Sequence, residues 1–232
     1  ANGNAIAGAT VVLAATGAGN TLTQPAAVTD ANGIATGTLA STVAEAKTLS
    51  ATIDGTAVTQ TGTVTVTPGV VAAAQSTVAV APASIVAGVG TSTITVTARD
   101  ANGNVIAGQP VTLAATGTGN TLTQPVAVTD ANGVATGSLA STVAAAKTVS
   151  ATIDGTAITQ TATVTVTAGA ISVAQSIVEV SASTIAAAVG STDVTVTVRD
   201  AFGNGVSGAT VLIAATGTGN TVTQPLAVTD AN

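Results

Sequence analysis

The sequence contains no Cys, His, Met, Trp or Tyr, and its one aromatic residue is Phe202. The lack of Cys excludes disulfides, thiolate nucleophiles and soft-metal sites. The lack of His removes the side chain that most often serves as a general base or as a metal ligand. No two carboxylates stand close together along the chain. These absences predict that the chain is not an enzyme and that it binds no cofactor.

One group of residues resembles a nucleophile beside a base. Ser141 and Thr142 precede Lys147 by a few positions, and a Ser–Lys pair can support nucleophilic catalysis. We interpret these residues as a polar loop with one solubilising lysine, and we expect no catalytic residue here.

Charge is also scarce. Only 6% of the 232 residues are charged and the net charge is −6. The basic residues are Lys47, Arg99, Lys147 and Arg199. Four scattered cations cannot follow a phosphate backbone, and one aromatic ring offers little base stacking, so nucleic acid is an improbable partner. Thr, Ser or Gly interrupts every apolar run, which also argues against a membrane span.

What the chain does contain is an internal repeat with a period of 100 residues. Residues 1–100 and 101–200 are identical at 70 positions, without an insertion or a deletion. A third copy begins at Ala201. A unit of this length is a whole domain rather than one turn of a solenoid, so the sequence predicts a tandem array of domains.

The least similar segments of the repeat, near 70–94 and 170–194, mark the expected joints. The predicted domains are residues 1–72, the C-terminal part of one repeat; 73–172, a complete repeat; and 173–232, the N-terminal part of another. A partial unit cannot bury a full core, so we expect the chain to be one segment of a longer tandem array. In an alternative interpretation, partial units from different chains complete each other, although they overlap by 32 repeat positions.

Within each unit, apolar residues alternate with Thr and Ser, which is typical of half-buried β-strands. Residues 91–99, 148–153 and 161–167 show the pattern most clearly. The residues predicted to face the core are Ile94, Val96, Ala98, Val149, Ala151, Ile153, Ala162, Val164 and Val166. The segment 141–147 has the composition of a short helical turn, and little else favours helix.

Turn signals separate the strands. Asp154 and Gly155 predict a two-residue hairpin, because Gly accepts positive φ at low cost. About seven short strands in roughly 100 residues describe a β-sandwich. The predicted fold class is therefore all-β, a tandem array of sandwich domains with a 100-residue repeat.

The string "RDANGN" at residues 99–104 has two interpretations. Asp at the first position and Gly at the fourth favour a type I turn, with Gly103 in a left-handed conformation. A calcium site would need six to eight oxygens. It would therefore require Asp100 to converge with Asp130 or Asp154. We favour the turn and keep these three residues as weak calcium candidates.

The segments "VTARDANGNVIAGQPVTLAATG" and "AVTDANGVATGSLAST", followed by "SATIDG" and "TVTVT", resemble the bacterial immunoglobulin-like domain, group 1. Two D-x-x-G turns about 30 residues apart, with G-x-x-V-x-L between them, make this resemblance fairly specific. It covers essentially the whole chain. It implies immunoglobulin-like sandwiches in the extracellular stalk of an invasin- or intimin-type adhesin on a bacterial cell surface, with no catalytic residues.

The expected joints are short and apolar, unlike flexible Gly/Ser linkers. We expect Val70, Val71, Ile171 and Val173 to pack between neighbouring domains and to stiffen a rod. The leading hypothesis is a stalk or fibre that acts as an extended spacer for adhesion. Its partners would be the neighbouring repeats of the same chain.

Two alternatives remain open at this point. The solvent-facing sides of the predicted sheets carry rows of uncharged Thr, so little charge repulsion would oppose association. Other copies of the chain could therefore assemble into an extracellular filament. The Thr rows could also bind an ordered surface such as ice or a polysaccharide, although the twist of a sheet disrupts a flat array.

Overall fold

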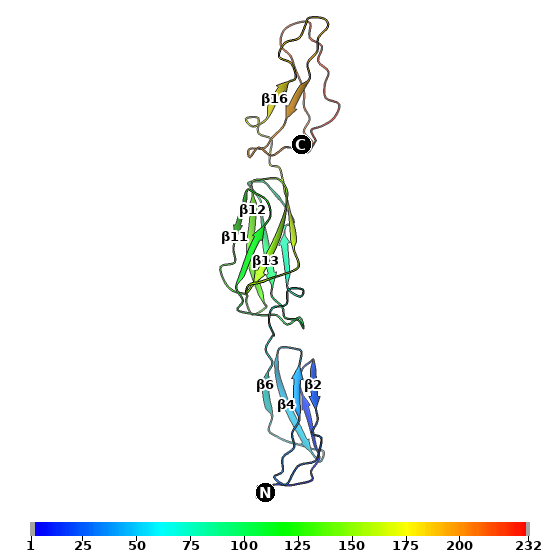
Figure 1. The fold of residues 1–232 in the computed structure, drawn as a ribbon, viewed down its shortest axis with the longest axis vertical. Coiled ribbons are helices and arrows are strands. Elements are labelled where there is room, and N and C mark those ends of the chain that lie inside the picture. The colour runs from blue at the N-terminus through cyan, green and yellow to red at the C-terminus, as the bar shows by residue number, and fades with distance from the viewer. Residues whose placement is uncertain (1–2, 231–232) are drawn as a thin grey trace.

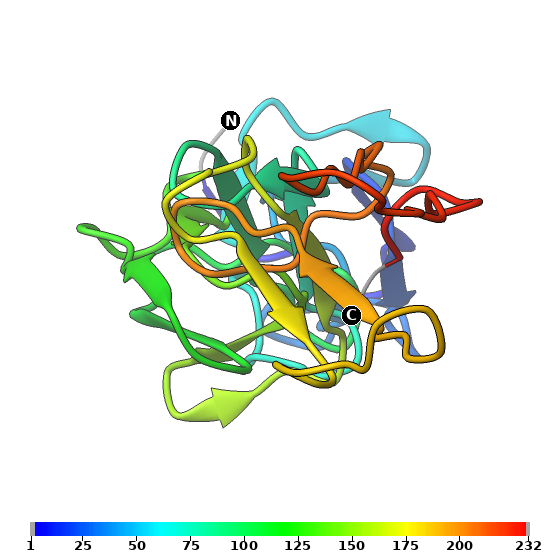
Figure 2. The ribbon, with the colours of Figure 1, turned by 90° about the horizontal axis from the view of Figure 1, so that it is seen from above.

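The computed structural model describes residues 3–230, which form strands and turns arranged as three units in a row (Figure 1). We call residues 3–67 the N-terminal unit, 71–167 the central domain and 171–230 the C-terminal unit; residues 68–70 and 168–170 link them. Seen along the rod, the units overlie one another (Figure 2). Within residues 3–230, no helix is long and apolar enough to cross a membrane.

The central domain is a sandwich of two sheets. One has the strand order β11-β12-β9-β7, and the other has the order β10-β13-β15-β8 with the short β14 paired to β13. The strands are β7 (Thr77–Ala81), β8 (Ser84–Val86), β9 (Thr91–Thr97), β10 (Val111–Ala115), β11 (Asn120–Thr123), β12 (Val134–Ser141), β13 (Ala146–Ile153), β14 (Thr156–Ala157) and β15 (Ala162–Thr167). The predicted all-β sandwich is confirmed.

The core forms where the expected alternation placed it. On β9, Ile94 and Val96 are fully buried, while the intervening Thr95 faces outwards. On β13 and β15, Val149, Ile153 and Val164 close the opposite side of the same apolar cluster. Period-2 alternation therefore places the aliphatic side chains between the sheets and the hydroxyls outside.

The first strand of the central domain is divided between the two sheets. β7 pairs antiparallel with β9, and after the turn at Pro82 the chain continues as β8, which pairs parallel with β15 in the other sheet. One segment thus covers an edge of each sheet, which leaves fewer backbone groups open for pairing with another chain.

The N-terminal unit contains β1 (Val11–Ala15), β2 (Asn20–Thr23), β3 (Thr38–Ser41), β4 (Ala46–Ile53), β5 (Thr56–Ala57) and β6 (Gly62–Thr65). β1, β4, β5 and β6 form one sheet, and β2 pairs with β3. Its described residues include no counterpart of β9. As a consequence, Ile53 is 42% exposed where Ile153 is 0%, and Val64 is 45% exposed where Val164 is 0%.

The C-terminal unit contains one antiparallel pair, β16 (Ile177–Val180) with β17 (Val194–Thr197). The chain that follows β17 runs back along this pair as turns and extended segments (Figure 1). Several apolar side chains of this unit are exposed, among them Val178 and Leu212.

Two local predictions have different outcomes. Asp154 and Gly155 join β13 to β14 with φ values of 46° and 77°, and Ile153 pairs with Thr156, so the two-residue hairpin is confirmed. The segment 141–147, which has the composition of a short helical turn, contains instead the end of β12, a bend at 142–145 and the start of β13. The backbone groups of the bend bond outside the loop, as described below.

Candidate functional site at the joints between units

The joints are not apolar in the way the sequence suggested. Val70 is 89% exposed and Val173 is 91% exposed, so neither side chain packs between neighbouring units. Val71 is partly buried, but it packs against the core of the central domain, and Ile171 is 53% exposed. Hydrogen bonds from side chains of one unit to backbone groups of the linker and of the preceding unit join the units instead.

The string at 99–104 is a turn, and it stands at the first joint. The N–H of Gly103 donates to the carbonyl of Asp100 at 3.0 Å, and Gly103 has a φ of 84°. One carboxylate oxygen of Asp100, Oδ1, accepts the N–H groups of Asn102 and Asn104, each at 2.9 Å. The expected type I turn, with Gly in the left-handed region, is therefore present.

The other oxygen of Asp100 reaches the linker. Oδ2 accepts the N–H of Gly69 at 2.9 Å and the side-chain amide of Asn104 at 2.8 Å. Burial raises the pKa of the Asp100 carboxyl, but the hydrogen bonds from Asn104, Gly69 and Asn102 outweigh burial and lower the pKa below its ordinary value. The ionised carboxylate thus fixes the direction in which the linker enters the central domain.

Asn104 bridges the central domain and the N-terminal unit. Its Oδ1 accepts the N–H of Ala44 at 2.9 Å, and its Nδ2 donates to the carbonyl of Thr42 at 2.9 Å. Because Nδ2 also donates to Asp100, the amide is held from both sides. We call this arrangement, Asp100 and Asn104 with Gly69, Thr42 and Ala44, the joint clasp.

The second joint repeats the clasp. Asp200 Oδ2 accepts the N–H of Gly169 at 2.8 Å and the amide of Asn204 at 2.7 Å. Asn204 in turn bonds Ala144 N and Thr142 O, both at 2.9 Å. The pKa of Asp200 is lowered in the same way, because its hydrogen bonds outweigh the opposing effect of burial. Two independent joints with the same bonds indicate a device that belongs to the repeat itself.

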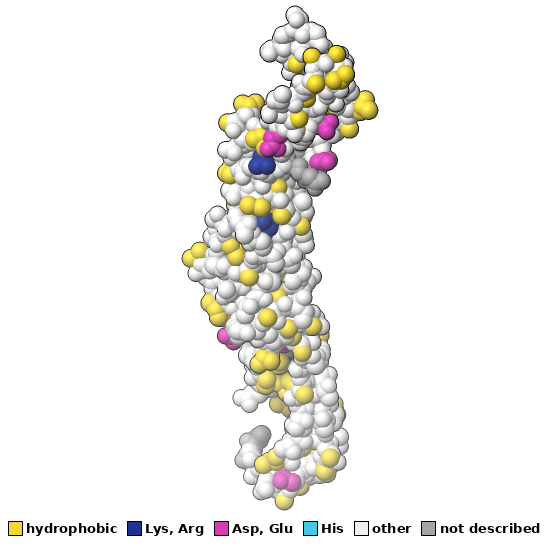
Figure 3. All heavy atoms as spheres, turned by 45° about the horizontal axis from the view of Figure 1, so that its top comes forward, with side chains coloured by type: hydrophobic (Ala, Val, Ile, Leu, Met, Phe, Trp, Pro, Cys, Tyr) yellow, Lys and Arg dark blue, Asp and Glu magenta, His cyan; other side chains and the backbone are white. Residues whose placement is uncertain are grey.

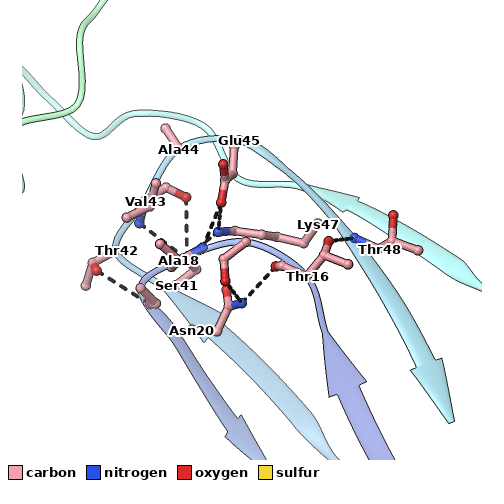
Figure 4. Close-up of polar contacts among 12 residues, drawn as sticks. Thr16, Ala18, Asn20, Ser41, Thr42, Val43, Ala44, Glu45, Lys47 and Thr48 are labelled. Atoms are coloured by element: carbon pink, nitrogen blue, oxygen red, sulfur yellow. Dashed lines mark hydrogen bonds and ion pairs between the residues drawn. The ribbon is translucent and has the colours of Figure 1, made fainter.

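A buried lysine, Lys47, supports residues 42–45, the loop that receives the clasp (Figure 4). Lys47, which is 0% exposed, donates to Ala18 O at 2.6 Å and to Glu45 Oε1 at 2.5 Å. Glu45 also accepts the N–H of Ala18, and the bond from Lys47 is the main cause that lowers the pKa of Glu45. These bonds tie residues 42–45, which include the clasp partners Thr42 and Ala44, to the neighbouring 16–20 loop.

Asn104 and Asn204 are functional residues that the sequence interpretation missed. The signal is the fifth position of the turn. The clasp turns read "DANGN" at 100–104 and "DAFGN" at 200–204, whereas the turns at 30–34 and 130–134 read "DANGI" and "DANGV". Asp30 and Asp130 cap their own turns through Asn and Ile or Val backbone N–H groups, but without the fifth Asn they have no amide to reach another unit.

The three weak calcium candidates have different roles in the structure. Asp100 accepts four N–H donors, which occupy the lone pairs that a cation would need. Asp130 caps its turn, and Asp154 lies in the exposed hairpin. Among residues 3–230, no three acidic side chains are grouped so that they could hold a metal ion.

The residues of the considered Ser–Lys pair are engaged with the backbone. Lys147 donates to Thr118 O at 2.8 Å, and the hydroxyl of Ser141 bonds Val143 O at 3.4 Å. Ser141 ends β12 and Lys147 lies in β13, on either side of the loop that receives the second clasp.

Comparison with known protein families now bears on this architecture. The model of the bacterial Ig-like domain (group 1) matches residues 1–67 and 75–167. The chain belongs to this family. The resemblance predicted from the turn motifs is therefore confirmed. A comparison with curated protein sequences gives no match.

Solved structures with this bacterial Ig-like fold include three with similar tandem domains. InvD of Yersinia pseudotuberculosis is 29% identical with a TM-score of 0.59, over 89% of this chain and 64% of InvD. FdeC, an Escherichia coli adhesin, is 26% identical with a TM-score of 0.63, over 90% of this chain and 68% of FdeC. Invasin, a bacterial integrin-binding protein, is 27% identical with a TM-score of 0.53, over 88% of this chain and 42% of invasin. The chain thus spans less than two thirds of the InvD and invasin chains.

Proposed function

We propose that the chain is a stiff stalk segment of a bacterial surface protein, located outside the cell, where it spaces an adhesive part from the cell. The observation that carries this proposal is the joint clasp, which occurs twice with the same partners and nearly the same distances. The group 1 Ig-like family and the adhesin neighbours support the same function.

The clasp supports stiffness because it restrains each joint at separate points. Asp100 holds the linker, while Asn104 holds a loop of the preceding unit that lies 60 residues earlier in the sequence. Each neutral hydrogen bond contributes about 0.5–1.5 kcal/mol net. A three-residue linker adds little slack, since flexible chains gain reach only with length. The neighbouring repeats of the same chain are therefore the proposed partners.

The exterior suits a spacer. On the face shown in Figure 3, charged side chains are few, and the hydrophobic ones stand singly or in small groups among backbone and uncharged polar side chains. Across the chain, four basic and ten acidic residues leave much of the surface to Thr and Ser. The proposed role therefore rests on the joints and on the family of the chain.

The test is the distribution of distances across the first joint. The chain has no Cys, so the replacements Thr61→Cys and Thr161→Cys place one spin label on each side, at repeat-equivalent exposed positions. Pulsed electron spin resonance should give one narrow distance distribution. Asn104→Ala should broaden it, and Asn102→Ala, which removes an exposed amide of the same turn, should leave it unchanged.

A broad distribution in the doubly labelled chain without any clasp replacement, together with solution scattering typical of a flexible string of domains, would contradict the stalk. Ordered multi-chain filaments in electron micrographs of the purified chain would instead indicate self-assembly. The scattering and the micrographs need no replacement in the chain.

A further inference from the structure

The one aromatic ring of the chain lies at the second joint. Phe202 occupies the third position of the clasp turn, where Asp200 Oδ1 accepts its N–H at 2.8 Å. Its ring lies against Gly88 of the central domain: a Cβ built on Gly88 would be 2.0 Å from Cε2 and 2.2 Å from Cζ of Phe202. The ring therefore occupies the space that any side chain at position 88 would need.

Gly88 belongs to the tight turn between β8 and β9. Its N–H donates to Ser141 O at 2.9 Å, which ties this turn to the end of β12 beside the loop that receives Asn204. Phe202 and Asn204 thus contact neighbouring parts of the same end of the central domain. We call the turn at 87–90 the ring socket.

The internal repeat separates the two reasons for which a glycine could stand at position 88. Gly88 has a φ of 72°, a conformation that favours glycine. Its repeat counterpart is Ala188, which has a φ of 69° in the same turn of the C-terminal unit. Because Ala188 takes the same backbone conformation there, the turn can hold Ala, at the strain that a left-handed φ imposes on any side chain. The ring of Phe202 adds a steric requirement for Gly at position 88 that Ala188 does not face within the described residues.

The clasp turns vary at the matching position. The repeat counterpart of Phe202 is Asn102, whose side chain is exposed at the first joint. The socket carries Gly at position 88, which leaves space for a ring, and Ala at position 188, which leaves less. The third residue of the clasp turn is aromatic at position 202 and polar at position 102. The five residues of the joint clasp are the same at both joints, whereas the third residue of the clasp turn differs between them.

We propose that the residue in the ring socket and the third residue of the following clasp turn form a matched pair that determines which repeats fit together. A socket with Gly accepts a following unit whose turn carries an aromatic residue. A socket with Ala, as at position 188, accepts a unit whose turn carries a polar residue such as the Asn at position 102, and it excludes an aromatic one. This inference rests on the proposed stalk, because it gives the stalk a defined order of near-identical repeats.

The test is a double-mutant cycle on the whole chain, with Gly88→Ala, Phe202→Asn and both together. Spin labels at Thr112→Cys and Thr195→Cys, exposed positions on the central domain and the C-terminal unit, report the docked fraction of the second joint. Overpacking typically costs 1–3 kcal/mol, so Gly88→Ala should reduce the docking equilibrium constant roughly tenfold. In the Phe202→Asn background the same replacement should change it less than about twofold.

Ala188→Gly is the matched control, since this position faces no ring of the following unit in the described residues, and it should leave the second joint unchanged. An equal loss from Gly88→Ala in both backgrounds would overturn the inference, because the cost would then come from the backbone. No loss in either background would overturn it as well, because the ring would then not occupy the socket.

A measurement on the unmodified sequence keeps the inference testable if Gly88→Ala fails to fold. Labelling with 4-fluorophenylalanine gives one fluorine resonance, because Phe202 is the only phenylalanine. A docked ring should show about half the H2O-to-D2O shift of a free one, in keeping with its exposure of 52%. The full shift of a free ring would contradict docking. A rod that stays extended while the ring is free would overturn this inference alone and leave the stalk standing.

Discussion

The ammonium nitrogen of Lys147 lies 2.8 Å from the carbonyl oxygen of Thr118, in a position where the residue is 1% exposed. Its repeat counterpart, Lys47, bonds both a carbonyl and the carboxylate of Glu45. The difference arises because Ala145 stands where the first repeat has Glu45. The central domain thus holds the same lysine without the carboxylate that accompanies it in the N-terminal unit.

We expect Ala145→Glu to stabilise the central domain, because a buried ammonium group gains from a carboxylate that the fold already accommodates in the first repeat. Thermal unfolding followed by far-ultraviolet circular dichroism should show a higher midpoint at neutral pH. Ala146→Glu is the control, since strand alternation directs that side chain to the opposite face. Equal shifts for the two variants would show that added negative charge, and not the ion pair, is responsible.

The sequence predicts local structure well here and contacts between units poorly. The alternation over 91–98 and the Asp154–Gly155 turn are determined by neighbouring residues, and both have the predicted conformation. The partners of Asn104, by contrast, lie 60 and 62 residues away. No periodicity reveals that a turn side chain will meet backbone groups of a preceding unit.

Hydrophobicity also misled the interpretation of the joint. Val70 was expected to be buried because an exposed valine is unfavourable, yet a folded surface carries many isolated apolar side chains. Val70 is 89% exposed, whereas the N–H of Gly69 needs an acceptor and finds one in Asp100. Satisfying a backbone donor is the stronger demand at such a place.

The repeat provides a paired test of core packing. Ile153→Ala should destabilise the central domain by about 2–5 kcal/mol, because Ile153 is fully buried and its removal leaves a cavity. Ile53→Ala should cost about 1 kcal/mol or less, because Ile53 remains 42% exposed. Without Trp or Tyr, amide hydrogen exchange is the suitable measurement, and it assigns each loss to its unit. Equal losses at the two positions would contradict the difference in burial.

Two glycines in different surroundings give a second test: Gly155 in the hairpin between β13 and β14, and Gly62 at the start of β6 in the N-terminal unit. Gly155 has a φ of 77°, so Gly155→Ala should destabilise the central domain by about 1–2 kcal/mol. Gly62 has no atom within 4 Å of a built Cβ, and its repeat counterpart is Ala162. Gly62→Ala should therefore stabilise the N-terminal unit by about 0.5–1 kcal/mol. Hydrogen exchange separates the two units, and a loss of stability from Gly62→Ala would contradict the equivalence of the repeats.

Acid should open the second joint. The pKa of Asp200 lies below its ordinary value of 3.8 in the folded chain, so its contribution is complete above that value and is lost as the pH falls through the lower, folded pKa. Oδ2 accepts one hydrogen from the N–H of Gly169 and one from the amide of Asn204. If Oδ2 were protonated, its own hydrogen would lie close to these two hydrogens and would weaken both bonds. The joint should therefore stay docked at pH 5 and loosen only below about pH 4.

Distances between labels at Thr112→Cys and Thr195→Cys, measured across a pH series, check this expectation, while circular dichroism confirms that the sandwich itself remains folded. The second joint is the better choice because Asp30 and Glu45, whose pKa values are also lowered, belong to the N-terminal unit. Asp200→Asn should weaken the joint at neutral pH. It should also abolish the opening of the joint that the unreplaced chain shows below about pH 4. If that variant still opens at the same pH as the unmodified sequence, the carboxylate at the clasp is not the titrating group.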